Sequence, residues 1–263
     1  MKKKTILIIL FYSFLFNQVK SQNIVNTAFR GNEVLKFVAS YNMSGLWTDL
    51  AQITMSVKAV RMNEKNLYKL VSTAQTYTKW DSYFKIRDSY QSWVNPKTIK
   101  PYIFKRDVNE GGFIIKVKYI FKRKSLVAKS TMQVNKNAAK TSVVKINANT
   151  LDLVSAIYYF RNIDFSQTPV NTVKTLTVLI DNKLTKIQLK YRGKEKIKVS
   201  GYGTKECYKI GISLKDQNIV KNNPTNNIWL TADKNKVPVL IKAVIPVGSI
   251  QIRLSQMTGL RNK

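Results

Sequence analysis

Apolar and polar side chains alternate along several stretches of this 263-residue chain. One stretch has an apolar residue at every second position: Phe113, Ile115, Val117, Tyr119 and Phe121. Two later stretches repeat this period: Val237, Val239, Ile241, Ala243, Ile245 and Val247, and then Ile250, Ile252 and Leu254. Such alternation places successive side chains on opposite faces of a β-strand, so that one face of each strand is buried. We therefore expect a mainly β protein with about a dozen strands.

Turn-forming residues separate the expected strands: Asn95-Pro96, Glu110-Gly111-Gly112, Lys234-Asn235 and Val247-Gly248. Short turns join strands as hairpins and favour antiparallel pairing. We expect a single domain over residues 22–263, because no Pro-, Gly- or Ser-rich linker divides the chain. Residues 135–149, rich in Lys, Asn and Ala, are expected to form a long loop. The predicted fold is a strongly curved antiparallel sheet, either an open barrel or a sandwich, with one or two short helices packed on it.

Two helices are expected to interrupt the strands. A short one over residues 79–85 would place three aromatic side chains on one face: Trp80, Tyr83 and Phe84. A longer one over residues 151–161, capped by Asn149 or Thr150, would have an apolar stripe: Leu151, Val154, Ile157 and Tyr158. Both aromatic groups could pack in the core or stack on a ligand, and the core interpretation is favoured.

The N-terminal segment has the layout of a secretory signal. Three lysines follow Met1, an apolar stretch covers residues 6–16, and small residues precede Gln22. The apolar stretch is too short to span a bilayer, which needs about 20 residues. We expect residues 1–21 to be removed, leaving a periplasmic or secreted protein without a transmembrane span. The lone cysteine, Cys207, lies far from this segment, so a lipoprotein is not expected.

The chain is strongly basic, with 45 Lys and Arg residues against 14 Asp and Glu residues. A positive field attracts anionic partners, and outside the cytoplasm these would be lipid head groups or an anionic envelope polymer. Nucleic acid is not expected as a partner, because no aromatic-basic motif of a known nucleic-acid fold occurs. An AT-rich coding sequence would also explain the abundance of lysine, and this alternative stays open. The oligomeric state is left open as well.

Lysines also alternate with apolar residues between residues 186 and 198. We expect a hairpin here, with Leu189 facing Ile197 across a loop centred on Gly193. Its solvent face would present a cationic stripe for an anionic surface: Lys186, Lys190, Arg192, Lys194, Lys196 and Lys198. The alternative, which is favoured, is that these lysines prevent aggregation between exposed strands.

The chain contains no histidine and one cysteine. Ser-His-Asp and Cys-His catalysis are therefore excluded, and a zinc site would lack its usual ligands. No cofactor, no metal and no intrachain disulfide are expected. Cys207 is interpreted as a small buried hydrophobic residue of a strand.

Carboxylates are the remaining candidates for catalysis. The densest cluster joins residues 87–90 and 106–110 across the Asn95-Pro96 turn. A hydrolase of cell-envelope polysaccharide would need two carboxyl groups with different pKa values. However, Asp88 and Asp107 each directly follow an arginine in the sequence, and this neighbouring charge would lower the pKa of either carboxyl. Cross-strand ion pairing is therefore favoured, and Asp164 is expected to cap the backbone or pair with Arg161.

Several segments in order resemble the bacterial exported family called domain of unknown function 3108. They are residues 31–35, 87–92, 106–112, 153–161, 229–233, 237–239 and 245–249, which read GNEVL, RDSYQS, RDVNEGG, LVSAIYYFR, WLTAD, VPV and IPVGS. The resemblance covers essentially the whole chain after the signal and implies a β-rich envelope protein with no assigned reaction and no catalytic residues. Asn95 departs from the pattern, where an acid is expected in relatives. A curved sheet with helices on its concave side also resembles carriers that shuttle lipidated proteins across the periplasm.

Our leading hypothesis is a non-catalytic envelope protein that binds an amphiphile or a partner in a concave sheet. The candidate ligand-binding residues combine the aromatic groups with the charged cluster: Trp80, Tyr83, Phe84, Tyr158, Arg87, Asp88 and Arg106. Two alternatives remain, the polysaccharide hydrolase and a scaffold whose interior is filled by side chains. A measurable internal cavity would distinguish the binding protein from the scaffold.

Overall fold

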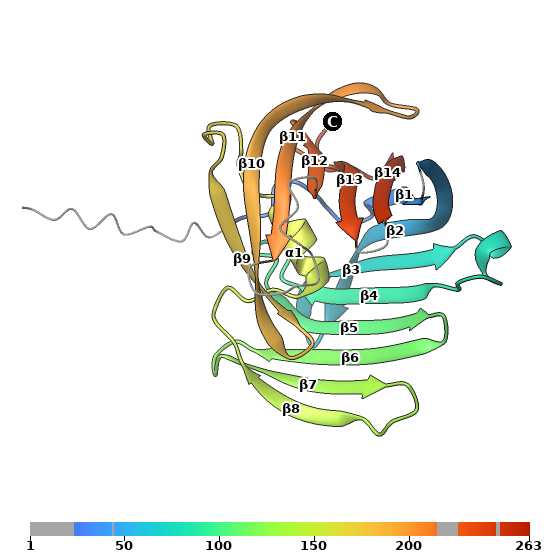
Figure 1. Ribbon diagram of the computed structural model, residues 1–263. Coiled ribbons are helices and arrows are strands. Elements are labelled where there is room, and N and C mark those ends of the chain that lie inside the picture. Colours follow the sequence, from blue (N-terminus) through green and yellow to red (C-terminus); the bar gives the residue numbers. More distant parts are fainter. Residues whose placement is uncertain (1–23, 44, 215–225, 246–247) are drawn as a thin grey trace, which may run out of the picture.

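The computed structural model describes residues 24–43, 45–214, 226–245 and 248–263 (Figure 1). The predicted signal, residues 1–21, lies outside these ranges. Within them the chain forms fourteen strands, one α-helix and one 3-10 helix. Their bounds are β1 Val34–Met43, β2 Leu46–Met62, β3 Lys65–Thr76, η1 Thr78–Trp80, β4 Arg87–Val94, β5 Pro101–Glu110, β6 Phe113–Lys122, β7 Val127–Val134, β8 Lys140–Lys145, α1 Leu153–Phe160, β9 Val173–Ile180, β10 Lys183–Val199, β11 Gly203–Leu214, β12 Asn227–Thr231, β13 Pro238–Ile245 and β14 Gly248–Thr258.

All the described strands belong to one antiparallel sheet. Its order is β8-β7-β6-β5-β4-β3-β2-β1-β14-β13-β12-β11-β10-β9. Strands that follow one another in sequence are paired, except for β8 and β9, and one further pair joins β1 to β14. The first and last strands therefore lie side by side in the middle, and β8 and β9 are the two edges. The mainly β, curved antiparallel fold predicted from the sequence is confirmed.

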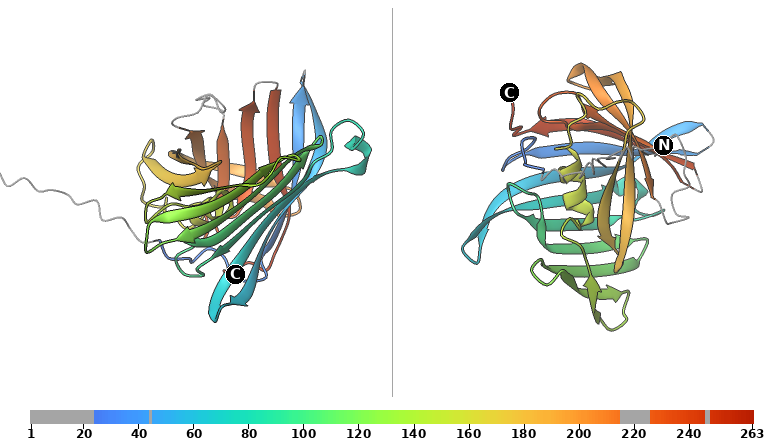
Figure 2. Two further views of the ribbon diagram at one scale, coloured as in Figure 1. Left: turned by 90° about the horizontal axis from the view of Figure 1, so that it is seen from below. Right: turned by 90° about the vertical axis from the view of Figure 1, so that its left-hand side faces the viewer.

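The sheet curls into an open barrel instead of closing through a backbone ladder. The turn between β9 and β10 contacts the concave face of β5 and β6 through side chains. Arg106 Nη2 donates to Asp181 Oδ1 at 2.6 Å, and the Asn182 N–H donates to Tyr119 Oη at 3.2 Å. Helix α1 lies on the concave side of the sheet (Figure 2). Among the described residues, neither helix has the length and hydrophobicity needed to cross a membrane.

The start of α1 is fixed by a buried aspartate. Asp152 Oδ1 accepts from the backbone N–H groups of Val154 and Ser155, and Ser155 Oγ accepts from the Asp152 N–H. This capping box satisfies backbone donors that a helix otherwise leaves free. Ser92 Oγ of β4 donates to Asp152 Oδ2 at 2.6 Å, which ties the helix to the sheet. The predicted cap at Asn149 or Thr150 was wrong by two or three positions.

Arg161 forms the C-terminal cap of α1 and is buried. Its guanidinium pairs with Glu33 at 2.6 Å, and the predicted pairing with Asp164 was wrong. Asp164 instead accepts from the Ser166 N–H at 2.9 Å, which is the other predicted role. The pair with Glu33 joins the helix to the segment that leads into β1.

Two segments that were expected to contain connections between strands are themselves part of strands. The expected loop at residues 135–149 contains β8, Lys140–Lys145, whose lysine-rich sequence suits an exposed sheet edge. The expected hairpin at residues 186–198 is one continuous strand, β10, and Leu189 pairs with Ile212 instead of facing Ile197. Gly193, with a φ of 96°, lies at a register shift where β10 bends and continues.

The expected helix at residues 79–85 is reduced to η1, Thr78–Trp80, followed by a turn. Asp81 accepts hydrogen bonds from Thr76 and Arg87, so the ends of the loop are joined before a second helical turn forms. Tyr83 is 81% exposed and Phe84 is 51% exposed, so the core interpretation of this aromatic group was wrong.

Candidate functional site

An apolar cavity of about 340 Å³ lies on the concave face between α1 and the sheet. Sixteen described residues line it, and Ser72 is the one among them with a polar side chain. The helix contributes Leu153, Ala156, Ile157 and Phe160, and the sheet contributes Phe37, Ile53, Met55, Ser72, Leu176, Ile187, Leu189, Ile212, Ile228, Pro238, Ile241 and Ile252. Ligand pockets of proteins typically enclose about 300–1,000 Å³ and are mostly apolar. The volume and the lining are therefore those of a small-molecule pocket.

The strand register explains why the cavity is apolar. Ile228, Ile241 and Ile252 are directly opposed across β12, β13 and β14, so their side chains point to the same face. Phe37 of β1 opposes Ile53 of β2 in the same way. The side chains of these rows are the alternate residues of each strand that face the concave side of the sheet.

Side chains do not fill the space under the helix. Ile53, Ile241 and Ile252 face the concave side and yet are only half-buried. Ile157 of α1, which also lines the cavity, remains 38% exposed. Apolar groups in a filled interior would lose nearly all of their accessible surface. The alternative of a solid interior is therefore wrong for this part of the sheet.

A polar row begins at the edge of this cavity. Ser72, Tyr90 and Arg106 are successive partners across β3, β4 and β5 and share the concave face. Burial raises the pKa of Tyr90 to about 12, so its hydroxyl stays protonated and can donate a hydrogen bond. Arg106 Nε is buried and has no hydrogen-bond partner among the described residues. The row therefore offers two donors next to apolar walls.

Asp88 lies two residues before Tyr90 on β4, and its side chain therefore points to the same face. Burial, and then the nearby carboxylate of Glu110, raise the pKa of Asp88 to about 6. The Asn109 N–H donates to Asp88 Oδ1 at 3.2 Å. The two carboxyl groups thus interact unfavourably when both are ionised.

The predicted ion pairs of this region were wrong in their partners. Arg87 pairs with Asp81, and Arg106 pairs with Asp181, which is 75 residues away in sequence. Consequently no arginine neutralises Asp88 among the described ion pairs, and its pKa rises instead of falling. Asp107 is the next residue after Arg106 on β5, so its side chain points to the opposite face of the strand. It therefore cannot form a catalytic pair with Asp88.

The structure distributes the seven candidate ligand-binding residues over three places. Asp88 and Arg106 lie on the concave face beside the cavity. Tyr158 is fully buried on α1, with its ring 4.7 Å from that of Phe29, and does not line the cavity. The other four lie on or next to the loop between β3 and β4: Trp80, Tyr83, Phe84 and Arg87.

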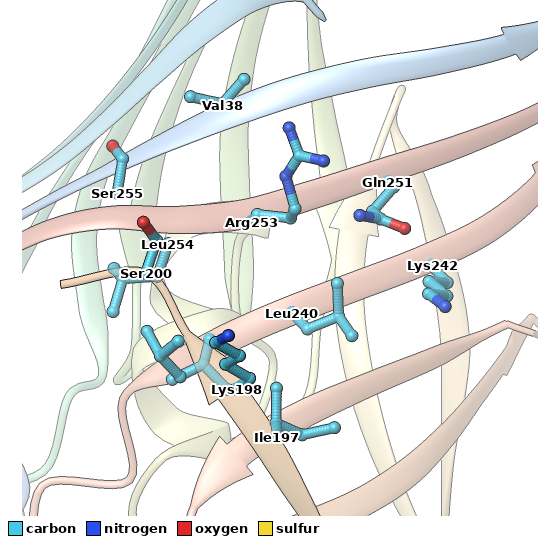
Figure 3. Close-up of a pocket in the computed structure, with 12 residues that line it drawn as sticks. Val38, Ile197, Lys198, Ser200, Leu240, Lys242, Gln251, Arg253, Leu254 and Ser255 are labelled. Carbon is cyan, nitrogen blue, oxygen red and sulfur yellow. The ribbon is translucent and has the colours of Figure 1, made fainter. Parts of the chain in front are cut away.

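The residues of the lysine stripe lie along β10, but the prediction that they share one face was wrong. Lys190 opposes Gly211 and Lys194 opposes Tyr208, and these two partners lie three residues apart on opposite faces of β11, so the register shift at Gly193 divides the stripe between the two faces. The far ends of β10 and β11 arch over β12, β13 and β14, where Tyr202 Oη accepts from the Met257 N–H at 2.9 Å (Figure 1). Of the stripe, Lys194 pairs with Glu206, and Lys198 lines a groove of about 510 Å³ under the arch. Figure 3 shows Lys198 in this groove together with Lys242 and Arg253. Arg253 is paired with Asp49, so the groove is basic but partly neutralised.

Sequence reasoning identified the alternating strands but missed the residues that line the cavity. Their signal was present, because Ile187, Ile241 and Ile252 belong to the apolar halves of alternating stretches. Among the described residues, no group of three or more Cys, Asp or Glu side chains could hold a metal ion. The apolar lining of the cavity and the row Ser72, Tyr90 and Arg106 give the concave face an apolar surface with a polar margin.

Comparison with solved structures finds a similar fold. The crystal structure of a β-barrel-like protein of domain of unknown function DUF1849 from Brucella abortus has a TM-score of 0.56 to this chain. The match covers 89% of this chain and 99% of that one, at 8% identity, so it concerns the fold alone. No curated protein matches the chain. The family described as "Protein of unknown function (DUF3108)" matches residues 36–255, and the chain belongs to this family.

Proposed function

We propose that this chain is a non-catalytic exported protein of the cell envelope that binds the apolar part of an amphiphile in its concave cavity. The observation that carries the proposal is the cavity of about 340 Å³, in which Ser72 is the one polar member of the described lining. Water in such a space makes few hydrogen bonds, so an apolar chain displaces it favourably. Helix α1 covers the site and leaves Ile157 partly exposed at its border.

The polar row supports an amphiphile over a purely apolar ligand. Tyr90 and Arg106 follow Ser72 along the same face, so a ligand whose tail occupies the cavity would place its polar group near them. The buried Arg106 Nε would gain a hydrogen-bond partner from such a group. A carboxylate, phosphate or hydroxyl group would satisfy this donor.

A fluorescent fatty-acid analogue tests the cavity. We expect saturable binding to the processed protein, and Ile157→Trp should weaken it about tenfold or more by occupying the space. Val143→Trp is the matched control, because Val143 is an exposed apolar residue on edge strand β8, outside the cavity. Equal affinity in both variants, with melting temperatures near that of the wild type, would exclude the cavity as the site.

The carboxyl pair favours one alternative, a hydrolase acting on envelope polysaccharide. A carboxyl group with a raised pKa beside a second carboxylate is the arrangement of a general acid. Asp88→Asn and Glu110→Gln would each abolish release of reducing sugar ends from envelope polysaccharide while the melting temperature stays close to that of the wild type. Absence of any activity in the wild-type protein, tested on purified cell-wall fractions, leaves the binding function in place.

Export is part of the proposal and rests on residues 1–21. Their cationic start, apolar middle and small residues support removal before Gln22. N-terminal sequencing of protein recovered from the periplasm or the medium should begin near Gln22. Recovery of the intact precursor from soluble cytosol would contradict export.

The surface charge supports an anionic partner, lipid or polymer. The stripe on β10 includes Lys186, Lys190, Lys196 and Lys198, for which no ion pair is found among the described residues. Each such residue near an anionic membrane contributes about 1 kcal/mol. Binding to anionic vesicles that weakens steeply with salt is the expected result.

A further inference from the structure

Three connections at one end of the sheet carry exposed apolar side chains. They are the β1–β2, β3–β4 and β5–β6 connections, which antiparallel order places at the same end of the strands (Figure 2). The exposed fractions are 73% for Leu46, 40% for Trp47, 81% for Tyr83, 51% for Phe84 and 48% for Phe113. We call these five residues the aromatic rim. Exposed apolar side chains that gather in one place mark interaction sites more often than scattered ones do.

The three connections touch one another, so the rim is continuous. Trp80 Nε1 donates to the Asp49 carbonyl at 2.9 Å, which holds the β3–β4 loop against the β1–β2 hairpin. The rings of Trp80 and Tyr83 are 5.8 Å apart. On the other side, a Cβ atom at Gly111 would lie 2.9 Å from the Phe84 ring, so Phe84 rests on the β5–β6 turn.

The charges of the rim favour an anionic surface. Of the acidic residues next to these aromatic groups, Asp49 is neutralised by Arg253 and Asp81 by Arg87. Glu110, which opposes Phe113, has no cationic partner among the described ion pairs, so it subtracts one charge from the basic surroundings of the rim. Lys79 and Lys85 have no carboxylate partner in the part of the chain that the structure describes. The Lys79 ammonium lies 5.5 Å from the centre of the Trp80 ring, so a cation lies directly beside an aromatic side chain of the β3–β4 loop. Aromatic side chains mixed with lysine are typical of segments that lie in the interface of a membrane.

The rim is at the open end of the barrel. The opposite end is closed by the segment before β1: Asn162 Oδ1 accepts from the Thr27 and Ala28 N–H groups, and the Asn26 N–H donates to the Lys97 carbonyl. The cavity-lining residues Ile187 and Ile212 lie near the ends of β10 and β11 that are on the rim side. A ligand entering along the strands would therefore pass the rim and not the closed end.

We propose that the aromatic rim docks on an anionic lipid bilayer and presents the open end of the barrel to it. The rim residues enter the head-group region, and Lys79 and Lys85 contact anionic head groups. The β10 stripe adds attraction at a distance but does not insert. Docking stands on the rim alone and does not require the proposed ligand, whose binding is measured without vesicles.

Vesicle sedimentation of the processed protein tests the docking. The vesicles contain phosphatidylglycerol and phosphatidylethanolamine, with phosphatidylcholine vesicles as the uncharged comparison. We expect the affinity for the anionic vesicles to fall by about tenfold or more in a triple variant, Leu46→Ser, Tyr83→Ser and Phe84→Ser. The matched control replaces three exposed apolar residues outside the rim, Leu126→Ser, Val143→Ser and Val170→Ser, and should bind like the wild type.

Quenching by lipids with a nitroxide on the acyl chain measures insertion directly. Native Trp47 and Trp80 lie in or beside the rim, so both are first replaced by Phe. In this background Tyr83→Trp should lose fluorescence on binding such vesicles, and Val143→Trp should not. Wild-type affinity in the rim variant, or equal quenching of both tryptophans, would overturn the proposal. So would binding that is lost only when Lys186, Lys190, Lys196 and Lys198 are replaced by Glu, since the stripe would then be the contact. Failure of docking with intact fatty-acid binding would leave the cavity function standing.

Discussion

The guanidinium of Arg161 and the carboxylate of Glu33 form a two-point ion pair, with N–O distances of 2.6 and 2.9 Å. Both side chains are almost completely buried. Arg161 also donates to the Asn235 carbonyl, so the end of α1, the start of β1 and the β12–β13 turn meet at one side chain. With its single cysteine the chain cannot form an internal disulfide, and this polar junction takes part of that structural role.

Breaking this ion pair should destabilise the protein strongly. Arg161→Met leaves Glu33 buried without its counter-charge, which costs about 3–5 kcal/mol in the free energy of unfolding. Urea denaturation followed by circular dichroism measures the loss. The double variant Arg161→Met, Glu33→Leu should recover a large part of it, because no isolated charge remains. A double variant as unstable as Arg161→Met alone would contradict this account.

Asp88 should make stability depend on pH. Its pKa is raised from 3.8 to about 6 in the folded protein, so the folded state holds this proton more tightly than the unfolded state. Its contribution is therefore complete below about pH 4 and is lost as pH rises through about 6. Asp88→Asn should raise the stability at pH 7 on the order of 1 kcal/mol, after allowance for solvent screening.

The same variant should flatten the stability profile between pH 4 and pH 7 without removing its slope, because the pKa of buried Asp152 is also raised to about 6. Unfolding midpoints in urea across this pH window provide the measurement. Asp107→Asn is the control, since Asp107 lies on the opposite face of β5. An unchanged slope in Asp88→Asn would mean that this carboxyl does not carry the raised pKa.

The cap of α1 should be sensitive to the shape of residue 152 more than to its charge. Asp152→Ala removes the acceptor for two backbone N–H groups and leaves the Ser92 hydroxyl unpartnered, with an expected loss of about 2–4 kcal/mol. Asp152→Asn keeps an oxygen acceptor and should cost less than half of that. Thermal unfolding of the two variants gives the comparison, and equal losses would contradict the capping interpretation.

Alternation in the sequence was sufficient to predict the sheet, but not where strands bend. Around Gly193 the parity of Leu189 and Ile197 fits a three-residue hairpin loop, and it also fits a strand with a bulge. The partner that distinguishes the two is Ile212, and pairing with a later strand cannot be read from residues 186–198 alone. The loop at residues 79–85 has helical spacing, yet the contacts of Asp81 with Thr76 and Arg87 override this local preference.

The candidate site shows the same division between local pattern and distant contact. Asp88 and Arg106 were identifiable as a charged cluster because they lie on adjacent strands. That Arg106 pairs with Asp181 was not, since this contact exists only because the β9 edge curls back over β5. Likewise, alternation assigns Ile241 and Ile252 to the inner face, whereas the space in front of them depends on the position of α1.

The contact between the two halves of the curled sheet gives a last prediction. Asp181→Asn removes the ion pair with Arg106, whose partners are 51% and 11% exposed, and should cost about 1 kcal/mol or less. The loss should be local: amide hydrogen exchange in β9 should accelerate up to about fivefold, because this edge is attached to β5 and β6 by few other bonds. Glu206→Gln, which removes the exposed pair with Lys194, is the matched control and should leave exchange in β9 unchanged. If both variants accelerate exchange in β9 equally, the Arg106 contact does not hold the barrel in its curled form. The β9 edge is then kept in place by its other contacts, which include backbone hydrogen bonds with Leu151 and the apolar contacts of Leu176 and Val178.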